Sequence, residues 1–175
     1  TIATGGFSTK TGSIGSYNSS TIDLIIMIFM FLSGINFALH YHALKGKPLY
    51  YIKDSEFRFY SFLILIVIII VCLSLYNINY APISECLIKG SFTSIALITG
   101  TGFSSVNYDQ WPNAMRILLV GMMFFGGCAG STTGGMKIMR IHVIIKKMIR
   151  EMKIFMRPSA IIHTKLDGKP VETND

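Results

Sequence analysis

Two short glycine motifs of the same kind stand 96 residues apart, and each is followed by a long apolar stretch. The first motif is TGGFST at residues 4–9, and the second is GTGFSS at residues 100–105. Both place small residues before a Gly-Phe pair and two hydroxyl residues after it. Irregular backbone at membrane depth is tolerated only where protein buries it or where it lines a watery cavity. The repeat therefore predicts a pore, because glycines let backbone carbonyls face an ion.

The composition places the chain in the membrane class. Of its 175 residues, 51% are hydrophobic and only 14% are charged, whereas soluble domains carry about 25% charged residues. The mean hydropathy is +0.51. Residues 59–76 are almost wholly apolar and, with their flanks, are long enough to cross a bilayer, which takes about 20 residues. We predict an all-α integral membrane protein.

The charge of the chain is unevenly distributed, with a net value of +7. The basic residues after the last membrane-type stretch are Lys137, Arg140, Lys146, Lys147, Arg150, Lys153 and Arg157, opposed by Glu151. Positive residues that flank membrane segments mark the cytoplasmic side. This distribution favours a membrane protein with a cytoplasmic basic end over a nucleic-acid-binding protein.

No group of side chains indicates catalysis or metal binding. The acids Glu85, Asp109 and Glu151 fall in separate elements, and the three cysteines are widely spaced. The histidines do not cluster with cysteines or carboxylates, and we interpret His40 and His42 as interfacial. We therefore expect no enzyme, no bound cofactor, no disulfide framework and no transition-metal site.

The pattern of apolar and punctuating residues predicts a simple order of elements. Gly46 and Pro48 interrupt the chain after the first apolar stretch, and Trp111 stands beside Tyr108, which is typical of an interfacial belt. Small residues at Ser33-Gly34 favour helix packing. The expected elements are a loop at 1–20, a helix at 21–42, a cytoplasmic connection at 43–56, a helix at 57–76, an outer turn at 77–82, a short helix at 83–98, and a last helix from 113 to 156 that is broken in its middle.

The short helix at 83–98 is unusual, because Glu85, Lys89 and Gly90 lie inside it. Its 16 residues reach only about 24 Å, which is too short to span comfortably. We predict a re-entrant helix whose C-terminal end, with its partial negative charge, lies beside the second glycine motif and favours a cation. Glu85 and Lys89 have the spacing of an intrahelical ion pair.

The break in the last helix is a glycine-rich run. Five of the ten residues from Gly126 to Gly135 are glycines, which cannot hold a regular helix well. A phosphate-binding loop is disfavoured, because Lys137 comes one residue late and Ile138 replaces the metal-binding hydroxyl. The run is either a packing kink or a gate across an ion path, and its position below a filter-like motif favours the gate.

The chain resembles the Trk/Ktr family of microbial potassium uptake proteins, and in particular its TrkH-like members. The resemblance covers essentially the whole chain. Its motifs are ATGGFST at residues 3–9, TGF at 101–103 with Trp111-Pro112, GGCAGST at 126–132 and FLSGINF at 31–37. The run at 126–132 is highly specific to the family.

The resemblance implies four covalently joined units of helix, pore helix, filter loop and helix around one pore. Residues 1–42 match the filter and inner helix of the second unit, 43–56 a cytoplasmic loop, 57–156 the third unit, and 157–175 a cytoplasmic tail. The chain is then a fragment of a longer protein. The implied filter residues are Thr4, Gly5, Gly6, Phe7, Gly100, Thr101, Gly102 and Phe103. The implied gate residues are Gly126, Gly127, Gly130, Ser131, Thr132, Gly134, Gly135 and Lys137.

The resemblance also implies a function and partners. It implies potassium translocation across the bacterial inner membrane by a multi-pass protein, a homodimer, and a cytoplasmic ring of nucleotide-binding regulatory subunits. The residues leave open whether transport is channel-like or a symport. The basic segment at 146–157 faces either that ring or the lipid surface, and anchoring at the lipid surface is favoured. Two rival hypotheses are a non-transporting assembly or signalling subunit and an integral-membrane enzyme.

Overall fold

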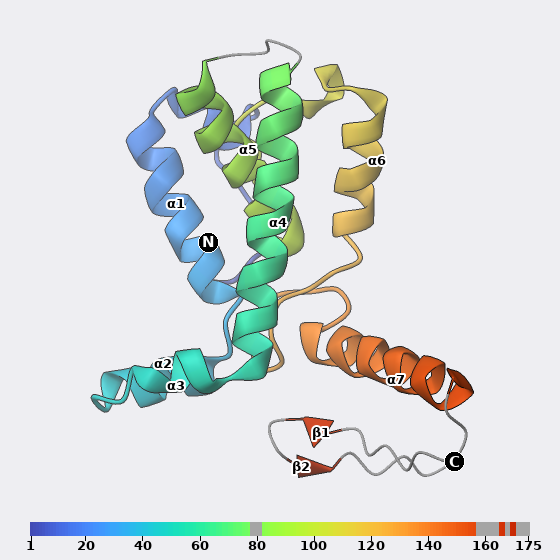
Figure 1. Cartoon of the computed structure of the whole chain (residues 1–175). Helices are drawn as coiled ribbons and strands as arrows, with labels where there is room; N and C mark the ends of the chain where they lie inside the picture. Colours follow the sequence, from blue (N-terminus) through green and yellow to red (C-terminus); the bar gives the residue numbers. More distant parts are fainter. Residues whose placement is uncertain (78–81, 157–164, 167–168, 171–175) are drawn as a thin grey trace.

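The chain folds mainly into helices (Figure 1). The computed structural model describes residues 1–77 and 82–156 in full, and the backbone of residues 165–166 and 169–170. The elements are the helices α1 (Ser20–Ser33), α2 (Phe37–Leu44), α3 (Leu49–Lys53), α4 (Ser55–Asn77), α5 (Ile83–Ile98), α6 (Asn113–Met122) and α7 (Ile138–Met156), the 3-10 turns η1 (Ser13–Tyr17) and η2 (Tyr108–Gln110), and the strands β1 (Lys165–Leu166) and β2 (Lys169–Pro170). The predicted all-α class is confirmed, since each strand has only two residues.

The helix α4 forms the axis of the molecule, and α1, α5 and α6 stand around it (Figure 1). Its long apolar run makes it the one helix in the described residues that is long and apolar enough to cross a membrane without a bend. The short helix α5 packs along α4, and the close approach is made at Gly90, which lies against Val71 and Cys72. The bounds of α5 agree with the predicted helix, and the predicted ion pair between Glu85 and Lys89 forms.

The predicted single helix at 21–42 is wrong, because the chain bends by 102° between α1 and α2. The helix α1 ends at Ser33, and the side chain of Asn36 begins α2 by accepting a hydrogen bond from the Ala38 amide at 2.9 Å. The connection predicted at 43–56 is also shorter than expected, because α2 runs to Leu44, α3 lies within the connection and α4 begins at Ser55. Figure 1 shows α2 and α3 lying across the lower end of α1 and α4.

The last helix is broken as the glycines predict. The helix α6 ends at Met122 and α7 begins at Ile138, so the glycine-rich run lies between two separate helices. In Figure 1, α7 leaves the bundle at its lower end in the direction opposite to α2 and α3. The residues 78–81 of the predicted outer turn and the predicted tail at 157–175 lie outside the described residues, apart from the paired backbone of β1 and β2.

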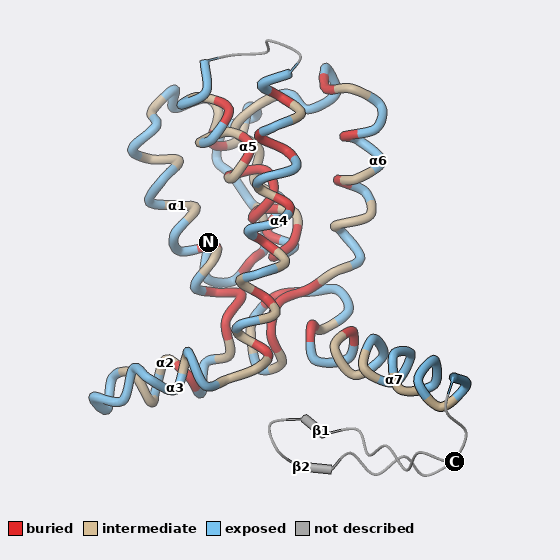
Figure 2. The backbone as a smooth tube through the Cα atoms, in the orientation of Figure 1, coloured by how far each residue is buried: buried red, intermediate tan, exposed pale blue. Residues whose placement is uncertain are grey.

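Buried residues gather along α5 and at the level where the α1–α2 bend, the start of α4 and the glycine-rich run meet (Figure 2). Trp111 belongs to this core and is only 2% exposed, so its predicted place in a lipid-facing belt is wrong. By contrast, the outward face of α4 leaves Phe62, Leu65 and Leu73 more than half exposed. An apolar surface of this size is typical of a face that meets lipid or another protein segment.

Candidate functional site

The two glycine motifs have the same backbone. In the first, the angle φ is positive at Thr4 (48°) and Gly6 (65°), and in the second it is positive at the corresponding residues Gly100 (66°) and Gly102 (74°). The residue between each pair has no positive φ. An alternation of this kind differs from a β-strand, in which φ is negative at every residue. The 96-residue sequence repeat is therefore also a repeat of conformation.

The two motifs lie side by side. The Gly6 backbone approaches the second motif so closely that a Cβ atom there would overlap the carbonyl oxygen of Thr101. Further along, the Gly15 amide donates to the Ser104 carbonyl at 3.0 Å, and the Ser104 amide donates to the Ser13 hydroxyl at 3.2 Å. A Cβ atom on Gly102 would meet nothing within 4 Å, so this residue borders open space.

The helix α5 ends directly at the second motif, as the re-entrant interpretation expects. The Gly102 amide donates a hydrogen bond to the Ala96 carbonyl at 3.1 Å, and this bond folds the motif back over the last turn of the helix. Below it, the Thr99 and Thr101 hydroxyls share a buried hydrogen bond of 2.8 Å, and Thr99 also donates to the Ile95 carbonyl. The C-terminus of a helix carries a partial negative charge, so its placement here favours a cation beside the motif.

The glycine-rich run forms a closed, hydrogen-bonded loop. Two backbone hydrogen bonds join its ends. The Gly126 amide donates to the Met136 carbonyl at 2.9 Å, and the Met136 amide donates to the Phe124 carbonyl at 3.0 Å. Inside the loop, the Gly127 amide donates to the Thr133 hydroxyl, and the Lys137 ammonium donates to the Ser131 and Thr133 carbonyls. This internal network is more ordered than a flexible kink requires.

The loop also bonds to the first glycine motif. The Thr4 hydroxyl donates to the Thr132 carbonyl at 2.9 Å, and the Thr132 hydroxyl donates to the Ile2 carbonyl at 2.7 Å. It comes near the second motif as well, because a Cβ atom on Gly100 would lie 3.7 Å from the Gly134 nitrogen. The structure therefore places the predicted gate loop against both predicted filter segments, at Thr4 and at Gly100.

The bend between α1 and α2 also contacts the glycine-rich loop. The sequence did not predict this contact. The Cys128 amide donates to the Gly34 carbonyl at 2.8 Å, and the Phe37 amide donates to the Gly130 carbonyl at 3.2 Å. A Cβ atom on Gly34 would overlap the Tyr60 hydroxyl, so the glycine also permits packing against α4. The broken helix leaves backbone groups free at its ends, and the loop satisfies them.

Glu56 is a second site residue that the sequence did not reveal. It lies in the stretch at 43–56 that the sequence predicts to be a cytoplasmic connection, yet it is only 8% exposed and its side chain contacts the loop. Its Oε1 atom accepts hydrogen bonds from the Ala129 amide at 2.6 Å and from the Met139 amide at 3.1 Å. The one sequence signal that could have identified it is an acid in the first turn of a membrane helix.

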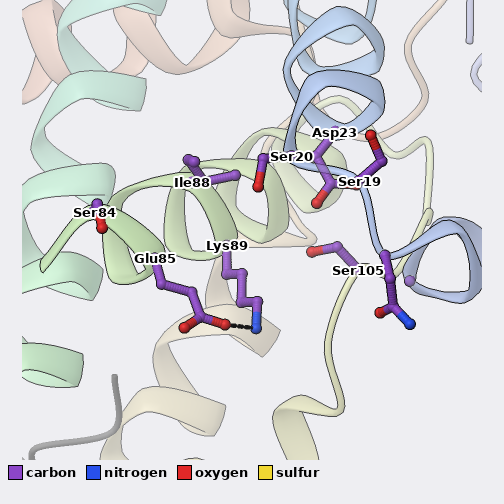
Figure 3. Close-up of a pocket in the computed structure, with 10 residues that line it drawn as sticks. Ser19, Ser20, Asp23, Ser84, Glu85, Ile88, Lys89 and Ser105 are labelled. Carbon is purple, nitrogen blue, oxygen red and sulfur yellow. Dashed lines mark hydrogen bonds and ion pairs between the residues drawn. The ribbon is translucent and has the colours of Figure 1, made fainter. Parts of the chain in front are cut away.

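A polar cavity of about 340 Å³ lies apart from the loop, between the first turns of α1 and α5 (Figure 3). Ser20 and Asp23 line it from α1, and Glu85 and Lys89 line it from α5 as an ion pair. None of the motif glycines lines it.

The histidine His40 has a structural role. Its Nδ1 atom lies 2.6 Å from the Tyr51 hydroxyl, and this contact joins α2 to α3. Among the described residues, no three histidine, cysteine or acidic side chains come together as metal ligands.

The site belongs to a chain with clear relatives. The profile of the TrkH family, described as a cation transport protein, matches residues 1–174. The Trk system potassium uptake protein TrkH of Salmonella typhimurium is 39% identical over 97% of this chain and 35% of its own length. TrkG of Escherichia coli K12 is 33% identical over 98% of this chain and 36% of its own length.

The fold has a solved counterpart. The crystal structure of the potassium transporter TrkH from Vibrio parahaemolyticus matches with a TM-score of 0.93 at 35% identity, over 97% of this chain and 37% of that one. These relatives are named as potassium transport proteins and not as enzymes. The chain spans about 35% of the length of the curated relatives it matches. Because the profile covers nearly every residue, the chain belongs to the TrkH family of cation transport proteins.

Proposed function

We propose that these residues form part of the ion path of a multi-pass potassium uptake protein in a bacterial inner membrane. Three observations support the proposal: the conformation shared by the two glycine motifs, their close approach at Gly6 and Thr101, and the named relatives. The observation that carries most weight is the shared backbone, because two segments far apart in sequence adopt it beside each other. A pair of such segments suits a path that coordinates an ion from more than one side.

In this proposal the two motifs are filter segments. Their backbone carbonyls replace water around potassium as it passes, and the end of α5 adds a favourable partial charge. The buried Thr99–Thr101 hydrogen bond holds the second segment in shape. The proposed filter residues are Thr4, Gly5, Gly6 and Phe7 in the first segment and Gly100, Thr101, Gly102 and Phe103 in the second.

The glycine-rich loop is the proposed gate. It bonds to the first filter segment through Thr132 and approaches the second at Gly134, so it closes one end of the proposed path. Lys137 bonds to loop carbonyls and stabilises the closed shape. The proposed gate residues are Gly126, Gly127, Gly130, Ser131, Thr132, Gly134, Gly135 and Lys137. Deletion of residues 130–135 is expected to raise potassium flux in the absence of a regulator, and unchanged flux would leave the loop a packing element.

The experiment that tests the proposal is growth of a potassium-uptake-deficient bacterial strain at low potassium. The strain expresses a complete TrkH-type subunit that carries these 175 residues, either unchanged or with Gly102→Ser. A serine must adopt the positive φ of Gly102, and its side chain enters the open space beside the motif. We expect rescue by the unchanged subunit and a raised KM or loss of rescue with the variant. Failure of rescue by a subunit shown to be in the membrane favours a non-transporting assembly or signalling role.

The partners proposed for the subunit are lipid, a second copy of the subunit and a cytoplasmic ring of nucleotide-binding regulators. Of these, lipid contact has support in the chain itself. The helix α7 leaves the bundle with apolar Met148 and Phe155 exposed beside the exposed basic residues Lys147 and Lys153. A basic amphipathic helix of this kind lies in the surface of an anionic membrane.

We expect the double change Lys147→Gln and Lys153→Gln to weaken this attachment by about 1 kcal/mol per lysine. Hydrogen exchange of the α7 amides is measured for the complete subunit in nanodiscs of neutral and of anionic lipid. Protection by anionic lipid should fall in the double variant and persist in the control Lys10→Gln, which lies between the first motif and α1. Equal protection in both lipids would favour the regulatory ring as the partner of α7.

A further inference from the structure

Glu56 is a buried carboxylate whose partners are backbone amides. One of its oxygens accepts from Ala129 at 2.6 Å and from Met139 at 3.1 Å. Ala129 lies within the glycine-rich loop, and Met139 lies in the first turn of α7. One side chain of α4 therefore contacts both the middle of the glycine-rich loop and the start of α7.

The environment of Glu56 differs from that of an ordinary ion pair. The one ion pair among the described residues joins Glu85 and Lys89, and the nearby Lys137 ammonium bonds to loop carbonyls instead. The negative charge of Glu56 is stabilised by two amide hydrogens and by the positive end of the α7 dipole. A buried carboxylate is costly without such partners, so the contact is maintained only while the loop and α7 hold their positions.

Asp54 provides the comparison within the same turn. Its Oδ1 atom accepts from the Phe57 amide at 2.7 Å, which caps the start of α4 in the usual way. Asp54 therefore serves its own helix, whereas Glu56, two residues later, reaches another segment of the chain. The two acids have the same charge and lie in the same turn, but they bind different segments of the chain.

The loop has two unequal halves. Gly126, Gly127 and Cys128 are buried, whereas Gly130, Thr132 and residues 134–136 are exposed, with Thr133 buried among them. Glu56 binds at Ala129, at the boundary between these halves. A loop fixed at this boundary keeps its buried half docked against the α1–α2 bend while its exposed half stays in contact with the first motif.

We infer that Glu56 is a positioning residue that holds the glycine-rich loop in its closed place by fastening it to α4 and to the start of α7. The inference rests on the proposed function, and it deepens that function by naming the side chain that sets the resting position of the gate. Loss of the charge weakens both hydrogen bonds, because hydrogen bonds to an ionised acceptor are about twice as strong as those to a neutral one.

The test has a readout that does not depend on transport. Cys128 is fully buried in the loop, and Cys72 and Cys86 are buried between α4 and α5. In the complete subunit, we expect Glu56→Gln to raise the rate of maleimide labelling at Cys128 about tenfold, read by mass spectrometry of the labelled peptides, with Cys72 and Cys86 still protected. Glu56→Asp, which keeps the charge and loses the reach, is expected to act alike. Asp54→Asn is the matched control and leaves Cys128 protected.

Potassium flux into proteoliposomes is measured on the same variants. Flux without a regulator should rise with Cys128 labelling in Glu56→Gln, while the KM for potassium stays at the unchanged value because the filter is untouched. Labelling of Cys128 equal to the unchanged subunit in both Glu56 variants overturns the inference, as does labelling of all three cysteines together, which indicates general unfolding. Raised Cys128 labelling with no flux from any subunit, including the unchanged one, supports the anchor and overturns the proposed transport function.

Discussion

The two glycine motifs share a backbone and differ in what supports it. The second is supported from within its own unit, because α5 precedes it and the buried Thr99 and Thr101 hydroxyls bond beneath it. The first is supported by a distant segment, because Thr4 bonds to the glycine-rich loop more than a hundred residues away. Thr4 is also a β-branched residue at positive φ, a conformation that persists only where the surroundings enforce it. We infer from this comparison that the second motif keeps its conformation independently of the loop. The conformation of the first motif depends on where the loop lies.

The most severe test of this comparison is an alanine at each central glycine. Both residues have positive φ, so both changes carry the same backbone cost, about 1 kcal/mol or more. Only at Gly6 does the added Cβ also overlap a backbone atom, the Thr101 carbonyl oxygen. We expect Gly6→Ala to abolish potassium-dependent growth of the complete subunit and Gly102→Ala to retain part of the uptake. Equal loss in the two variants, measured as maximal uptake rate at matched membrane expression, would show that the overlap with the Thr101 carbonyl adds nothing to the backbone cost.

Local patterns explain why part of this site was predictable. The apolar run of α4, the length of α5 and the Glu85–Lys89 pair are properties of neighbouring residues, and the structure reproduces them. The break before α7 follows from the low helix propensity of consecutive glycines. Such features need no knowledge of which distant segment lies alongside.

The unpredicted part depends on contacts between distant segments. The bend at Gly34 is stable because the loop at Cys128 supplies the hydrogen bond that a continuous helix would have made, and nothing in residues 21–42 reveals that partner. Glu56 resembles a solvated charge until Ala129 is placed beside it. Tryptophan is a residue type typical of membrane interfaces, but Trp111 packs into the core and is only 2% exposed.

A second test separates the two kinds of support. Thr4→Val removes the hydrogen bond to the Thr132 carbonyl and keeps the side-chain shape, while Thr4→Ser keeps the hydroxyl. We expect Thr4→Val to weaken the closed loop by about 1 kcal/mol and so to raise unregulated potassium flux several-fold. Thr4→Ser should stay near the unchanged flux. If Thr4→Ser leaks and Thr4→Val does not, the packing of the threonine methyl, and not its hydroxyl, holds the loop.

The smallest effect is expected at the corresponding hydroxyl of the second motif. Thr101→Val removes the 2.8 Å bond to Thr99, yet Thr99 still donates to the Ile95 carbonyl, so no buried hydroxyl is left without a partner. The expected cost is about 1 kcal/mol of stability, seen as a lower thermal midpoint of the complete subunit. The Thr101 carbonyl that faces Gly6 is unchanged. Unregulated flux and the KM for potassium should therefore stay constant, in contrast to Thr4→Val. A raised KM would place the Thr101 side chain on the ion path, and raised unregulated flux would mean that the second motif also holds the loop, so that the two motifs no longer differ in kind.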